Sequence, residues 1–119
     1  MLFVSLEKRQ KRVCKKYNLS FFPTSLDSIA GIADNIFDGI EPINGLRHPP
    51  EANTCGWYLW AGENITFSDN FLKPMCLKHL EKVNKNIFNY LALPPGGRFL
   101  IAENYEDVWY DKSLLNLNE

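Results

Sequence analysis

Carboxylates and aromatic rings alternate in residues 103–111, which hold the densest set of chemically capable side chains in this sequence. The acidic members are Glu103, Glu106, Asp107 and Asp111. The aromatic members are Tyr105, Trp109 and Tyr110. Paired carboxylates can act as general acid and general base, but carboxylates at a hairpin tip are more often solvated turn residues. Aromatic anchors among acidic groups are typical of a protein-binding surface, and such a surface also attracts a basic partner.

We therefore expect these side chains to form a protein-binding patch. Its members are Glu103, Glu106, Asp107, Trp109 and Tyr110, followed by Tyr58 and Glu63 from a second aromatic segment. That segment, residues 56–63, reads Gly-Trp-Tyr-Leu-Trp-Ala-Gly-Glu, and an uncharged aromatic run between glycines is typical of a strand. At least one of Trp57 and Trp60 should lie in the core.

Cys55 lies seven residues after His48 and is the one cysteine that suggests a nucleophile with a nearby base. Across a hairpin the two side chains could meet, which would give a small hydrolase or transferase. A cysteine at the start of a strand is more often a small buried residue with no role in catalysis. No histidine or cysteine pair has the spacing of a zinc site, and no glycine-rich loop resembles a phosphate cradle, so we expect no metal and no cofactor. Arg98 more simply pairs with one of the neighbouring acids.

The composition fits an ordinary globular domain, with 119 residues, 45% hydrophobic residues and a net charge of -1. Residues 1–16 hold six Lys or Arg and one acid, so a basic segment precedes a mildly acidic body. A solvated helix face explains that segment better than nucleic-acid binding does, although a nucleic-acid-binding adaptor stays an alternative. Three widely spaced cysteines, no signal-peptide core and no apolar run of membrane length favour a cytoplasmic protein without a membrane partner.

The periodicity predicts two or three helices. Residues 5–17 should form a helix with Ser5 as its N-cap and lysines in its last turn. A second helix should run from Pro74 to about Leu91, because apolar residues recur there at steps of three and four. Residues 26–37 fit either a helix or a short strand.

The strand signals predict two antiparallel hairpins. The first pairs residues 40–48 with residues 56–61, and the second pairs residues 98–103 with residues 108–110 across a turn at 104–107. Together these elements predict one α+β domain over residues 1–119. Its antiparallel sheet should have about four or five strands, with the two or three helices packed on one side.

Three strings in the sequence together resemble the immunity protein 33-like family, small bacterial proteins of polymorphic toxin systems. These strings are residues 56–63, residues 93–101 (Leu-Pro-Pro-Gly-Gly-Arg-Phe-Leu-Ile) and residues 105–111 (Tyr-Glu-Asp-Val-Trp-Tyr-Asp). The resemblance covers about residues 30–115. It implies a non-enzymatic immunity protein that binds a cognate toxin and blocks it, and the acidic patch fits a toxin with a basic surface. A regulatory adaptor and a small hydrolase, using Cys55 and His48 or the carboxylates of 103–111, are the alternatives.

Overall fold

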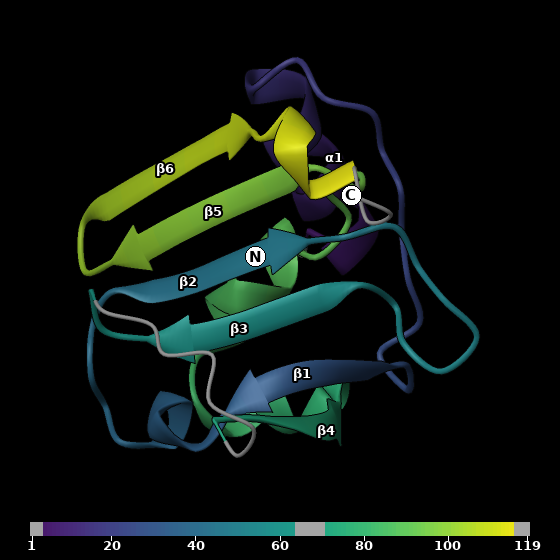
Figure 1. Ribbon diagram of the computed structural model, residues 1–119. Coiled ribbons are helices and arrows are strands. Elements are labelled where there is room, and N and C mark those ends of the chain that lie inside the picture. Colours follow the sequence, from purple (N-terminus) through teal and green to yellow (C-terminus); the bar gives the residue numbers. More distant parts are fainter. Residues whose placement is uncertain (1–3, 64–70, 116–119) are drawn as a thin grey trace.

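The computed structural model describes residues 4–63 and 71–115, and within them one mixed sheet has the strand order β4-β1-β3-β2-β5-β6 (Figure 1). The strands are β1 (Ile29–Ala33), β2 (Ile43–Arg47), β3 (Trp57–Ala61), β4 (Leu72–Cys76), β5 (Gly97–Ala102) and β6 (Tyr105–Tyr110). The helices are α1 (Leu6–Lys16) and the 3₁₀ helices η1 (Asp34–Phe37), η2 (Leu77–Lys82), η3 (Lys85–Tyr90) and η4 (Lys112–Leu115). The α+β prediction is confirmed, with six strands in the described residues instead of four or five.

The N-terminal helix and both hairpins form where the sequence predicts them. Ser5 caps α1 by accepting a hydrogen bond from the Lys8 N–H, and β2 pairs antiparallel with β3. The second hairpin has a tighter turn than we expected, at Glu103 and Asn104, because Asn104 adopts a positive φ of 62°. Asparagine tolerates that conformation, so β6 begins already at Tyr105.

The predicted helix from Pro74 to Leu91 is wrong. Pro74 lies instead in edge strand β4, opposite Gly31 of β1, where its missing N–H costs no internal bond. The chain then forms η2 and η3, which are separated because the Asn84 side chain accepts the Asn86 N–H and starts a new helix. The apolar spacing still identified fully buried residues such as Leu80, since 3₁₀ and α-helical periods are similar.

Residues 26–37 resolve into strand β1 followed by η1. β1 lies between β4 and β3, and its pairing with β3 is parallel, which makes the sheet mixed. Where β1 ends, the Asn35 amide continues the ladder. It donates to the Ala61 carbonyl at 2.7 Å and accepts from the Ala61 N–H at 3.1 Å.

The main core lies between the sheet and the layer made of α1, η2 and η3, which Figure 1 shows behind the strands. Trp57 and Phe99 project into it and are essentially unexposed, and the Trp57 Nε1–H donates to the Leu91 carbonyl at 3.0 Å. Trp60 points to the opposite face of β3, where it packs with Leu46. Both tryptophans of β3 are therefore buried, on different sides of the sheet.

Arg47 is buried in this core with 1% of its surface exposed. Its Nη1 donates to the carbonyls of Phe22 at 2.7 Å and Leu93 at 2.8 Å, and its Nε donates to the Cys55 carbonyl at 3.2 Å. The guanidinium also lies 4.9 Å from the ring centroid of Phe22 and 5.5 Å from that of Trp57. Burial lowers the pKa of Arg47 to about 10, so the group stays charged at neutral pH. Among the described residues, no carboxylate forms an ion pair with Arg47. The partial negative charge of the carbonyl oxygens stabilises this cation instead.

Replacing Arg47 should destabilise the fold strongly. In Arg47→Met the carbonyls stay buried without donors, and we expect the free energy of unfolding to fall by about 3–5 kcal/mol. Arg47→Lys should recover only part of this, because one ammonium cannot match the geometry of the guanidinium fork. Urea denaturation measures both, with exposed Arg12→Met as the control, expected within about 0.5 kcal/mol of the wild type. A methionine variant as stable as the control would contradict this role.

Candidate protein-binding interface

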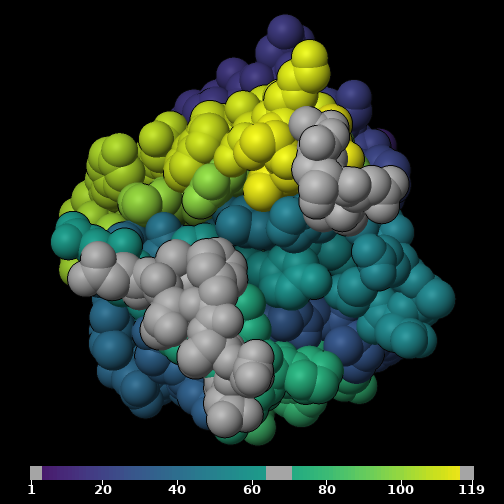
Figure 2. All heavy atoms as spheres, in the orientation of Figure 1, coloured from purple at the N-terminus to yellow at the C-terminus, as the bar shows by residue number. Residues whose placement is uncertain are grey.

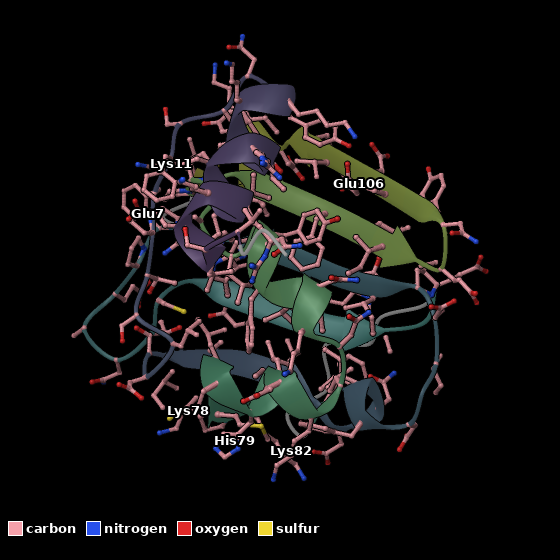
Figure 3. The ribbon with its side chains drawn as sticks, turned by 180° about the vertical axis from the view of Figure 1, so that it is seen from behind. Glu7, Lys11, Lys78, His79, Lys82 and Glu106 are labelled. Atoms are coloured by element: carbon pink, nitrogen blue, oxygen red, sulfur yellow. The ribbon has the colours of Figure 1, made fainter. Side chains whose placement is uncertain are left out.

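Strand alternation divides the predicted patch between the two faces of the sheet. We call the face opposite α1, η2 and η3 the front face, and its exposed or lining side chains include Leu46, Tyr58, Trp60, Arg98, Asp107 and Trp109. Asp107 and Trp109 of β6 share this face because they are two residues apart. Glu106 lies on the other side, toward the helices, as Figure 3 shows from behind.

Glu106 is hydrogen-bonded within the chain. Its carboxylate accepts from Tyr90 at 2.5 Å, Tyr17 at 2.6 Å and Lys16 at 2.8 Å, which ties β6 to η3 and α1. Partial burial acts to raise the pKa of Glu106, but these hydrogen bonds outweigh it and hold that pKa below its usual value. A partner on the front face would not reach this carboxylate.

Trp109 and Arg98 form the best-defined part of the front face. The Arg98 guanidinium lies 5.3 Å from the Trp109 ring centroid, and it donates to the Asp111 carboxylate at 3.0 Å. The expected pairing of Arg98 with a neighbouring acid is therefore confirmed. Trp109 is 36% exposed although it is held in place by this cation–π contact. A large apolar ring that is both exposed and positioned is suited to act as a binding anchor.

An apolar groove of about 560 Å³ lies next to this pair on the front face. Its lining includes Leu46, His48, Tyr58, Trp60, Leu72 and Leu114, with Arg98 and Asp111 at its rim. Figure 2 shows this face, with the yellow atoms of η4 and the yellow-green atoms of β6 along its upper part. Sequence reasoning missed most of these residues, because only strand register reveals which side chains share a face.

The remaining predicted residues lie in three different places. Tyr58 lines the groove and meets His48 edge to face at 5.4 Å. Tyr110 is 47% exposed and covers Gly96, on the helix side of β6. Glu63 and Glu103 are exposed just beyond the ends of β3 and β5.

Glu41 is a further acidic residue at this end of the sheet. Its carboxylate accepts the Glu103 N–H at 3.1 Å. Ile43 at the start of β2 is the register partner of both Ala61 in β3 and Ile101 in β5. The residues that follow β3 and β5 therefore lie at the same end of the sheet as Glu41. The register of the hairpins could have predicted that Glu41, Glu63 and Glu103 lie at one end of the sheet. Their wide separation in the sequence hides this proximity.

The structure separates the residues of the hydrolase hypothesis. His48 points to the front face, where its Nδ1 lies 3.0 Å from the Leu114 carbonyl oxygen, whereas Cys55 is buried in the main core behind the sheet. Glu106 and Asp107 likewise face opposite sides and cannot act on one substrate atom. No cluster of His, Cys, Asp and Glu in the described residues has the arrangement of a metal site. Among the described helices, none has the length and apolar character needed to cross a membrane.

Glu106→Gln should change the acid dependence of stability. Because the folded-state pKa of Glu106 is lowered, its contribution is complete above the usual glutamate pKa of about 4.5 and disappears as the pH falls through the folded-state value. At pH 7 we expect the variant to lose about 1–3 kcal/mol of unfolding free energy, and this difference should shrink toward pH 3. Urea denaturation across this range measures it, with exposed Glu103→Gln as the control. A difference that stays constant with pH would contradict the assignment.

Cysteine reactivity tests the thiol-enzyme alternative. Cys14 and Cys55 are buried and Cys76 is partly exposed, and burial raises the pKa of the Cys14 thiol. In the native protein we expect Cys55 to react with a thiol reagent at least roughly tenfold more slowly than Cys76. After unfolding, the two thiols should react at the same rate. Mass spectrometry of the labelled peptides distinguishes the sites, and rapid labelling of native Cys55 would favour the enzyme.

Comparison with known proteins identifies a family for this chain. Neither the curated proteins nor the solved structures contain a significant relative. The family model described as the Imm33-like domain matches residues 9–111, which include most of α1 and all six strands described above. The resemblance noted from the sequence strings is therefore confirmed over a longer range than expected, and this chain belongs to the Imm33-like family.

Proposed function

We propose that this protein binds a toxin protein through its front face and thereby blocks the toxin. Membership of the Imm33-like family supports an immunity role without an enzymatic step. The observation that carries the proposal is the exposed Trp109, which Arg98 holds beside an apolar groove. An anchored aromatic ring next to a groove of this kind is the usual centre of a protein–protein interface.

The charges beside this anchor support a basic partner. Asp107 is exposed and makes no ion pair among the described residues, and Glu103 is exposed at the adjacent turn. These carboxylates would attract a basic surface and accelerate association. The toxin would then lose access to its own substrate because the immunity protein covers that surface.

The basic segment does not favour the nucleic-acid alternative. Lys16 is paired with Glu106, Lys11 with Glu7, and the Arg9 Nε donates to the Asn89 side chain at 3.0 Å. Part of the positive charge of α1 is thus used to stabilise the fold. The free thiols of Cys14, Cys55 and Cys76 support a reducing compartment, and we propose that the protein acts in the cytoplasm.

Trp109→Ala should abolish protection without unfolding the protein. The test is co-expression with the toxin that a pull-down with this protein identifies, with cell growth and the dissociation constant of the purified pair as readouts. We expect Trp109→Ala to weaken binding by roughly 30-fold or more, and Asp107→Lys to slow association and remove most of its salt dependence. The matched controls are Phe37→Ala, which removes a ring with 41% exposure near the opposite edge of the sheet, and Asp38→Lys. Unchanged binding in both front-face variants would exclude this face.

A further inference from the structure

We propose that the outer edge of β6 is the place where an extended segment of the partner adds one further strand, antiparallel, to the sheet. This inference rests on the proposed function and specifies how the partner binds. It follows from three features of β6: its lack of lysine and proline, the direction of its backbone groups, and the charge beside it.

The two edges of the described sheet are built differently. β4 forms one edge and carries Lys73 and Pro74, two residue types that prevent other strands from pairing. β6 forms the other edge, and its sequence Tyr-Glu-Asp-Val-Trp-Tyr contains neither lysine nor proline. The charges of β6 are instead the carboxylates of Glu106 and Asp107, which oppose pairing with an acidic strand but not with a basic one. An edge strand of six residues that excludes acidic strands in this way suits selective docking of a basic strand.

The backbone of β6 presents hydrogen-bonding groups outward. The Asp111 N–H donates to the Gly96 carbonyl at 2.7 Å, which continues the β5–β6 ladder past the end of the strand. Bonding alternates along an antiparallel pair, so every second residue before Asp111 also faces β5. The N–H and C=O groups of Glu106, Val108 and Tyr110 therefore point away from β5, and no other strand of the described residues pairs with them.

The side chains beside this edge favour a basic strand. On the front face Asp107 stands between Tyr105 and Trp109, and both rings are exposed. A lysine or arginine in the added strand would lie next to Asp107 and could contact either ring through its cation. A second copy of this chain would instead bring another acidic β6 against the first, which like charges disfavour. We therefore assign the edge to a basic partner strand and not to self-association.

The arrangement also predicts which partner residues form the hydrogen bonds. In an antiparallel pair, residues directly opposite each other exchange both backbone bonds or neither, and their side chains share one face. Partner residues opposite Asp107 and Trp109 would point forward and form no bond to β6. Those opposite Glu106, Val108 and Tyr110 would point toward the helix side and would form the bonds.

Synthetic peptides of alternating lysine and valine test this geometry. If the lysine side chains lie on the front face, the valines lie opposite Glu106, Val108 and Tyr110, and their backbone groups form the hydrogen bonds to β6. N-methylation of the valine amides should therefore weaken binding at least roughly tenfold more than N-methylation of the lysine amides. Titration of the ¹⁵N-labelled full chain should shift the amides of Glu106, Val108 and Tyr110 most and slow their hydrogen exchange. Asp107→Lys should weaken binding about fivefold or more, whereas the exposed control Asp38→Lys should change it less than about twofold.

Several results would overturn the inference. The first is that the unmodified peptide does not bind at millimolar concentration. The second is that the two methylation patterns weaken binding equally. The third is that the peptide protects backbone amides of β4 or α1 from hydrogen exchange instead of those of β6. Concentration-dependent protection of β6 without peptide would assign the edge to a second copy. If the toxin is neutralised while the β6 amides stay unprotected in the complex, this inference fails and the proposed function stands. If the peptide binds as expected but the toxin is not bound, the proposed function fails.

Discussion

The buried guanidinium of Arg47 is the interaction on which the rest of this structure depends. It joins the segment before β1, the start of β3 and the segment after η3 through the carbonyls of Phe22, Cys55, Leu91 and Leu93. The Arg47 carbonyl in turn accepts the Gly96 N–H at 2.7 Å, just before β5 begins. One residue of β2 therefore fixes where the β5–β6 hairpin leaves the core, and with it the position of the surface that we assign to the partner.

A second polar cluster fixes the same hairpin from the other side. Glu106 connects β6 to Tyr17, Lys16 and Tyr90, so the helix layer holds the strand firmly. Because strand residues alternate between faces, fixing Glu106 toward the helices also fixes Asp107 and Trp109 toward the front. The acidic–aromatic segment is thus divided into a structural half and a half available for binding. A rigid edge strand with positioned side chains lowers the entropic cost of binding an extended partner.

This division also separates the groups that the catalytic alternative requires. The carboxylates that are adjacent in sequence lie on opposite sides of the sheet, and Cys55 and His48 are separated in the same way. Catalysis needs groups that converge on one reacting atom. Binding needs instead a broad surface with a few anchored side chains, which Trp109, Arg98 and the neighbouring groove provide. Family membership and geometry therefore support the same proposal independently.

The sequence by itself determined the elements whose signals are local. The capped helix at Ser5, both hairpins, the burial of at least one of Trp57 and Trp60, and the family strings could all be read from neighbouring residues, because capping, alternation and turn chemistry act over a few positions. Tertiary structure alone decided the rest. Pro74 could open a helix or lie on an edge strand, and only its pairing with β1 made it a strand residue. Glu106 and Asp107 look equivalent in sequence, but which one is free to bind depends on tyrosines far away in the chain that form hydrogen bonds with the other.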